Sequence, residues 1–514
     1  MTPTLLFHLL LFLLKVNGDE AFVSPSPNVR VFSGAWTSKD TKTQPSSTTV
    51  PPLFGGDAHG RETPAGSTTV ASQAALIAGT TIGGGFLALP SATAPCGAAP
   101  AAVGLLGVWC YLLGGALSLS EAIFMLKRHD TEAEAEDVSV FSLVRECFGG
   151  YAGALCGVLF LLLVKVTLVA QLSKVGALLE GAAPIMNRRH WTALFSIGMA
   201  SVCLVAKPRK VERLNDALTS VMLLSFTSLV ALAGGSGWHY NGLKRADYKS
   251  LLPSFTSKHS PWTIPIFIQL LIYNEVVPLV SSRLGDKGKV RRAILFGSSV
   301  PLIMCLVWSC IALGLVPYEP ASMLDGIVYD PLTNLGDALL SKGGPTGRLF
   351  LASVNALAGS AICTTVIGSI LASTQYFDDV MTSFYGSKRR VGCHKDNMTN
   401  GKSTADDDAN VGNVMLQKYQ KLITHALAVA PSAAIALWGS RNLYYRATSF
   451  AGAFPCTLLY GLIPPLCNLR IRRKLGKKRT KPTRTLRARD VALQGMLAVV
   501  SLLILLVAAY SGSS

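Results

Sequence analysis

Long apolar runs alternate with short charged segments along most of this 514-residue chain. A helix needs about 20 predominantly apolar residues to cross the ~30 Å hydrocarbon core of a bilayer. No charged residue occurs from Thr63 to Ser120, a stretch long enough for two spans joined by the Pro- and Gly-containing hinge 95–100. Nine further charge-poor blocks lie at about 150–180, 190–206, 215–236, 260–281, 294–316, 349–377, 422–439, 445–467 and 491–510.

This pattern predicts an all-α membrane protein of about eleven transmembrane helices. The composition agrees, because half of the residues are hydrophobic and only 15% are charged, against about 25% charged in an ordinary soluble domain. The block at 190–206 is the shortest, at the low end of the spanning range.

The amino-terminal region differs from the rest. A ten-residue apolar run, Leu5–Leu14, is too short to span and predicts a signal peptide over residues 1–21. Residues 22–69 are rich in Ser, Thr and Pro, which predicts a disordered transit-type segment before the membrane-spanning domain at 70–514. This order resembles the two-part presequences of algae with secondary plastids and implies a plastid inner-envelope location. The alternative is a secretory signal with a disordered tail and a plasma-membrane or endomembrane location.

The net charge of +18 is distributed unevenly across the predicted loops. Loops on the side of the mature amino terminus hold thirty Lys and Arg residues, and those on the other side hold ten. The positive-inside rule therefore places that terminus on the cytoplasmic or stromal side. The loop 470–489 carries eleven basic residues in twenty, which is typical of a topology determinant or a contact with lipid headgroups. We therefore expect membrane lipid, and no nucleic acid, as a partner.

Two of the apolar blocks are interrupted in mid-span. Residues 79–85 (GTTIGGG) place four glycines and two threonines within the first span, which is poor helix-forming chemistry. In the sixth span, Tyr273, Asn274 and Glu275 are followed by Pro278. Unwound backbone is tolerated at this depth only beside protein or a cavity, so both interruptions favour a binding site. Close packing of helices is the alternative reading of the glycines.

The matched positions of the two interruptions predict a five-plus-five inverted repeat with discontinuous helices 1 and 6 around one central site. Repeat one would cover 70–236 and repeat two 260–469, with an extra helix at 490–510.

The string from Gly79 to Pro90, GTTIGGGFLALP, closely resembles the first-helix motif of the tryptophan/tyrosine permeases. These form the aromatic amino-acid permease family within the amino-acid/polyamine/organocation superfamily. The resemblance implies eleven helices, a leucine-transporter-like inverted repeat with one extra helix, and proton-coupled import of aromatic amino acids.

A zwitterionic substrate needs partners for its carboxylate and its ammonium. Backbone N–H groups of an unwound glycine segment can bind the carboxylate, and carbonyl groups near the two interruptions can take the ammonium. The predicted substrate-binding residues are Thr80, Thr81, Ile82, Gly83, Gly84, Gly85, Tyr273 and Asn274. Phe86, Tyr273 and Phe267 are candidates, by position only, for an apolar slot around the substrate side chain.

Coupling to an ion gradient requires a group that gains and loses charge. Glu275 is the one carboxyl deep inside a predicted span, and Lys165 lies in the middle of the third span, 150–180. An intramembrane acid or base is a functional hypothesis by default because its charge is costly there. We therefore predict a Glu275–Lys165 ion pair that opens on transport, with a static structural pair as the alternative. Hydroxyls of the eighth span, including Thr364 and Thr365, could ligate sodium, or bond their own helix.

The remaining motifs exclude other chemistry. The eight histidines are scattered singly and no C-x-x-C pair occurs, so we expect no metal site, no cofactor and no enzymatic activity. The predicted function is secondary active transport of amino acids, aromatic ones (tryptophan or tyrosine) with protons. The alternatives are other neutral amino acids with sodium coupling or facilitated export, and, from another class, a membrane-embedded enzyme or a channel. The sequence predicts no oligomeric state.

Overall fold

The computed structural model describes residues 69–127, 139–233, 243–251, 262–315, 345–392, 405–440, 442–478 and 488–513. Across these ranges all regular structure is helical and no strand occurs, so the all-α prediction is confirmed. The predicted signal peptide and nearly all of the transit-type segment lie outside the described residues.

The first half of the chain runs from the broken first span to α8. Its elements are α2 (Val70–Thr81), η1 (Gly84–Ala88), α3 (Leu89–Thr93), α4 (Ala98–Lys127), α5 (Val140–Phe148), α6 (Gly150–Ala182), α7 (Arg188–Val205) and α8 (Pro208–Ala233). The predicted hinge lies between α3 and α4, where Gly97 adopts a φ of 86°, a conformation that favours glycine. Within the predicted loop 127–149, α5 forms because its apolar side chains pack on α6 and α17.

The second half contains a second broken span and a long π-helix. Its elements are η2 (Tyr248–Leu251), α10 (Thr263–Leu270), η3 (Asn274–Val276), α11 (Val277–Leu284), α12 (Lys287–Leu315), α14 (Pro345–Gly392), α15 (Ala405–Trp438), α16 (Leu443–Ala451), η5 (Gly452–Leu462), α17 (Ile463–Lys478) and α18 (Ala488–Ser513). The π-helix η5 joins α16 to α17 in one continuous span, Leu443–Lys474.

Nine helices in the described residues are long and apolar enough to cross a membrane, or ten if the bent first span counts as one. The predicted span at 190–206 corresponds to α7, whose first turn carries Arg188, Arg189 and His190 and is therefore too polar to pass that test. Its outer face nevertheless exposes Leu194 and Ile197, as a helix in contact with lipid would. The count of eleven stays a prediction.

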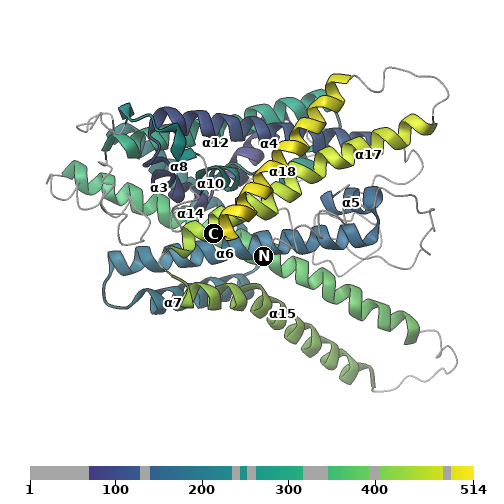
Figure 1. The fold of residues 1–514 in the computed structure, drawn as a ribbon. Coiled ribbons are helices and arrows are strands. Elements are labelled where there is room, and N and C mark those ends of the chain that lie inside the picture. The colour runs from purple at the N-terminus through teal and green to yellow at the C-terminus, as the bar shows by residue number, and fades with distance from the viewer. Residues whose placement is uncertain are drawn as a thin grey trace.

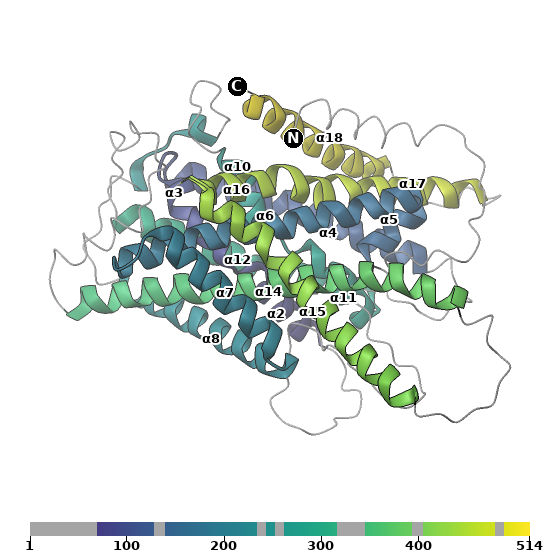
Figure 2. The same cartoon turned by 90° about the horizontal axis from the view of Figure 1, so that it is seen from below.

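Burial separates a central group of spans from a peripheral one. In the most apolar 18 residues of each span, 83% of the residues are buried in Leu443–Lys474 and 67% in Thr263–Leu284, whereas 22% are buried in α8 and 33% in α18. α18 lies along the outside of α17, and α7 packs beside α6 and α15 (Figures 1 and 2). The two most buried spans therefore form the centre of the bundle, and one of them is interrupted.

Both predicted interruptions are confirmed. The first break is residues 82–83, where the chain leaves α2 and bends by 48° before continuing through η1 and α3. The second break is residues 271–273, between α10 and η3, after which Pro278 lies in the first turn of α11. The inverted-repeat symmetry and its boundaries stay predictions.

Candidate functional site

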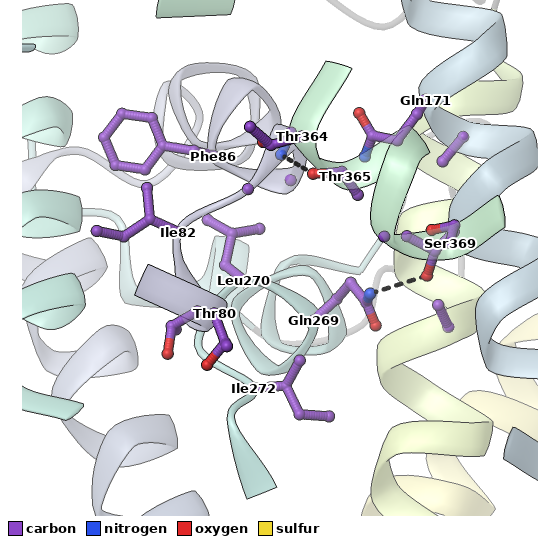
Figure 3. Close-up of a pocket in the computed structure, with 18 of the residues that line it drawn as sticks. Thr80, Ile82, Phe86, Gln171, Gln269, Leu270, Ile272, Thr364, Thr365 and Ser369 are labelled. Carbon is purple, nitrogen blue, oxygen red and sulfur yellow. Dashed lines mark hydrogen bonds between the residues drawn. The ribbon is translucent and has the colours of Figure 1, made fainter. Parts of the chain in front are cut away.

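A cavity of about 190 Å³ lies between the two breaks. Its walls also include residues of α6 and α14 (Figure 3) and of α8, α12 and α16. Seven of the residues predicted to act in binding or coupling line it, namely Thr80, Thr81, Ile82, Gly83, Gly84, Gly85 and Glu275. The structure therefore brings the first break and the acid of the sixth span to one place.

Tyr273 and Asn274 do not line this cavity, contrary to the prediction. Both are buried, and the Asn274 amide nitrogen donates to the carbonyl oxygens of Leu112 (3.4 Å) and Tyr460 (3.5 Å). Asn274 begins the short turn η3, and these two carbonyl groups hold its amide on the side away from the cavity. Ile272 and Glu275 point into the cavity, so the two residues between them point into the surrounding helices. Of the other slot candidates, Phe267 is fully buried behind the wall and only Phe86 lines the cavity.

Helices α14 and α16 hold the first break at Gly84. The Gly84 N–H donates to the Thr365 hydroxyl at 2.8 Å, drawn as a dashed line in Figure 3. The Tyr444 hydroxyl donates to the Gly84 carbonyl oxygen at 2.8 Å. In the described part of the chain, no hydrogen bond uses the N–H groups of Gly83 and Gly85. These two donors at the cavity wall are free to bind an anionic group.

Two of the glycines are required by their neighbours rather than by backbone conformation. A Cβ on Gly83 would lie 2.7 Å from the Thr365 hydroxyl oxygen, and one on Gly84 would lie 2.0 Å from the Gln171 amide oxygen. Gly79 has nothing within 4 Å of the same position. Gly83 and Gly84 therefore permit close packing of neighbouring helices, and they do so at the unwound segment itself, so both readings of the glycines apply.

Sequence reasoning missed two amides that line the cavity, Gln171 on α6 and Gln269 on α10. The Gln269 amide nitrogen donates to the Thr167 hydroxyl at 3.2 Å, and the Cys456 thiol donates to its amide oxygen at 2.9 Å. A usable signal existed, because polar side chains are costly in a span, but a single glutamine carries no motif.

One wall of the cavity is apolar. Phe86 stacks on Trp308 of α12 with ring centroids 5.6 Å apart and meets the Phe226 ring of α8 edge-on at 5.9 Å. Ile82 and Leu270 extend the same wall (Figure 3). Stacked and edge-on rings of this kind are favoured beyond their burial alone, so the surface is rigid and suited to a flat apolar group.

Glu275 is the one charged residue among those lining the cavity. Its carboxylate makes no hydrogen bond or ion pair with any residue that the structure describes. The predicted ion pair with Lys165 is therefore absent. The Lys165 ammonium instead donates to the carbonyl oxygens of Leu427 (2.8 Å) and Ala428 on α15. Pro431 explains this, because it has no N–H to offer the Leu427 carbonyl one turn earlier.

Comparison with known proteins finds two bacterial relatives of similar sequence. The chain is 25% identical over 243 residues to "tyrosine-specific transport system 1" of Haemophilus influenzae, matching 47% of this chain and 56% of that protein. It therefore spans little more than half the length of that relative. It is also 25% identical over 320 residues to "tyrosine-specific transport system 2" of the same bacterium, matching 61% of this chain and 74% of that one.

Among solved structures, a manganese transporter of Eremococcus coleocola aligns with a TM-score of 0.47 and 15% identity over 85% of this chain and 86% of that chain. The model of the tryptophan/tyrosine permease family matches residues 67–507. Since that match includes both breaks and the residues that line the cavity, the chain belongs to the tryptophan/tyrosine permease family.

Proposed function

We propose that this protein is a secondary active transporter of aromatic amino acids, tryptophan or tyrosine, and that it binds them in the cavity between the two breaks. The observation that carries the proposal is the composition of that cavity. It combines unpaired backbone N–H groups at Gly83 and Gly85, an aromatic wall at Phe86 and a single carboxyl at Glu275. The family, and the tyrosine transport named for the relatives, support the same substrate class.

In this proposal the substrate carboxylate accepts hydrogen bonds from the free N–H groups of the first break. Backbone donors without their own partners suit an anion, and a ligand there replaces the lost helical bonds. The aromatic ring then lies along Phe86 and Leu270, and carbonyl groups near Thr80 and Ile272 take part in binding the ammonium. No basic side chain lines the cavity in the described residues, so backbone N–H groups supply the partial positive charge that binds the substrate carboxylate.

We propose Glu275 as the proton-coupling group, without Lys165. A carboxylate that has no partner inside a membrane is costly as an anion. We therefore expect that binding of a proton to Glu275 and binding of substrate in the cavity favour each other. When Glu275 is protonated, a zwitterion entering the cavity meets no net charge. Lys165 already bonds carbonyl groups on α15, and its position supports a structural role.

The proposal is tested by uptake of tyrosine and tryptophan into liposomes containing the purified full-length protein. We expect saturable uptake that an inward proton gradient accelerates and a sodium gradient does not. With Glu275→Gln, the gradient should no longer drive accumulation, while exchange of internal for external tyrosine continues. Flux that never saturates would indicate a channel, and accumulation driven only by sodium would refute proton coupling.

The location is proposed from the amino-terminal segment alone, as a plastid inner-envelope membrane reached through a cleaved signal peptide. A fusion of residues 1–70 to a fluorescent protein tests it. Fluorescence at the secretory or plasma membrane, without plastid signal, would reject the plastid assignment and leave the transport proposal intact.

A further inference from the structure

The Gln171 side chain contacts the first break directly. It extends from α6 into the cavity wall and is only 2% exposed. Its amide oxygen lies so near Gly84 that a Cβ there would be 2.0 Å away. Among the residues that line the cavity, Gln171 alone has a fully buried side-chain polar atom without a hydrogen-bond partner in the described structure. A buried acceptor of this kind is destabilising until a donor reaches it.

The other amide in the cavity provides a contrast. Gln269 has its nitrogen bonded to Thr167 and its oxygen bonded to Cys456, so it completes the wall of the protein itself. In the described structure no donor of the chain bonds the Gln171 amide oxygen. The Gly84 N–H donates to the Thr365 hydroxyl. The Lys174 ammonium, one turn further along α6, lies over the Tyr444 ring, 5.4 Å from its centroid.

A donor from outside the chain would complete the hydrogen bonding of Gln171, and the position of the break indicates which donor fits. If the substrate carboxylate is bound by the N–H groups of Gly83 and Gly85, its α-ammonium, one carbon further along, is held beside Gly84. The phenol or indole end is then directed along Phe86. We propose that Gln171 is a substrate-binding residue whose amide oxygen accepts a hydrogen bond from the α-ammonium of the amino acid. This inference rests on the proposed function and adds a residue to it.

The test compares ligands that lack one donor each. Binding of radiolabelled tyrosine to the purified full-length protein is measured, with competition by phenylalanine, which lacks the phenol, and by 3-(4-hydroxyphenyl)propionate, which lacks the ammonium. We expect Gln171→Leu to weaken tyrosine and phenylalanine by the same factor, roughly ten- to a hundredfold for a charge-assisted bond. The propionate should bind the wild type weakly and lose nothing further in the variant.

Thermal melting supplies a matched control. Gln171→Leu removes no hydrogen bond that the structure records and removes an unpaired buried acceptor, so its melting temperature without substrate should be no lower than that of the wild type. Gln269→Leu leaves the Thr167 hydroxyl and the Cys456 thiol without their hydrogen-bond partner and should lower the melting temperature. If Gln171→Leu nevertheless fails to fold, the propionate still decides the matter in the wild-type protein, since binding as tight as that of tyrosine would overturn the inference.

Two further outcomes are decisive. Loss of tyrosine binding with phenylalanine unaffected would mean that Gln171 contacts the phenol and would overturn the assignment to the ammonium. Unchanged binding of both by Gln171→Leu would remove Gln171 from the site while the transport proposal stood. If the wild-type protein bound neither amino acid, the proposed function and this inference would both fall.

Discussion

The volume of one methyl group decides what the first break can accommodate. Gly83 and Gly84 face the side chains of Thr365 and Gln171 at distances shorter than a Cβ allows. Gly79, three residues before the break, faces open space. Glycine at 83 and 84 is therefore a packing requirement, whereas glycine at 79 is not.

Alanine substitutions should separate these positions. We expect Gly84→Ala to displace Gln171 and Gly83→Ala to displace Thr365, at an overpacking cost of about 1–3 kcal/mol each, with tyrosine affinity reduced roughly tenfold or more. Gly79→Ala is the matched control and should leave affinity within about twofold, because the new methyl group meets nothing. Equal loss at all three positions in equilibrium binding would contradict the packing argument.

The Tyr444 hydroxyl stabilises the same segment from the opposite side, by donating to the Gly84 carbonyl oxygen. Tyr444→Phe should cost about 1 kcal/mol of stability and weaken tyrosine binding, because the carbonyl loses its partner and the break its fixed position. The control is Tyr111→Phe, which breaks a 2.8 Å hydroxyl contact with Ser501 away from the cavity. It should lower the melting temperature similarly and leave tyrosine affinity unchanged.

At the scale of elements, Lys165 links α6 to α15 where a proline interrupts the hydrogen bonding of α15. The ammonium replaces the missing N–H of Pro431 at the Leu427 carbonyl and also lies 5.2 Å from the centroid of the Phe377 ring on α14. Three spans thus meet on one half-buried cation, which explains a lysine inside an apolar helix without assigning it to coupling.

A double-mutant cycle tests this structural role. Lys165→Met should destabilise the protein by about 1.5–3 kcal/mol, the value of a charge-assisted hydrogen bond. In a Pro431→Ala background the loss should be smaller, because alanine supplies an N–H to the Leu427 carbonyl. Melting temperatures of the four proteins measure the coupling between the two sites.

Transport by the Lys165→Met protein that remains folded should still respond to the proton gradient, unlike that of Glu275→Gln. Loss of that response with normal melting would restore Lys165 as a coupling residue.

Across the whole molecule, an ion cluster joins the ends of four spans. It consists of Glu121 at the end of α4, Lys287 at the start of α12, Arg472 in α17 and Asp490 at the start of α18. Glu121 contacts both Lys287 and Arg472 at 2.8 Å, and Arg472 contacts Asp490 at 3.5 Å. Three loops that the charge pattern assigned to the positive side therefore begin or end at one place, as the predicted topology requires.

The members of the ion cluster should differ in their effect on stability. Arg472 is 8% exposed and Lys287 is 50% exposed. Glu121→Gln leaves the buried guanidinium partly unpaired and should cost about 2 kcal/mol, less than the loss of a fully buried pair. Lys287→Met removes an exposed partner and should cost about 1 kcal/mol or less. Melting at low and high salt checks this, since only the exposed contact should weaken with salt.

Much of the architecture was accessible before the tertiary structure. Helical class, both breaks and the hinge before α4 follow from local chemistry, because apolar length, glycine content and proline act over a few residues. The span predicted at 190–206 coincides with α7, whose first-turn arginines lower its mean hydropathy although it exposes apolar residues, so this span stays a prediction.

The composition of the site depended on contacts between distant residues. The sequence by itself determined that an unwound glycine segment and one acid within a membrane span exist. Only the folded chain decided that Glu275 faces the cavity while Asn274 does not, that Lys165 bonds α15, and that Gln171 and Tyr444 contact Gly84 from α6 and α16. The physical reason is that hydrophobicity and backbone propensity are properties of neighbours along the chain, whereas the direction and partner of a polar side chain are set by which helices pack against it.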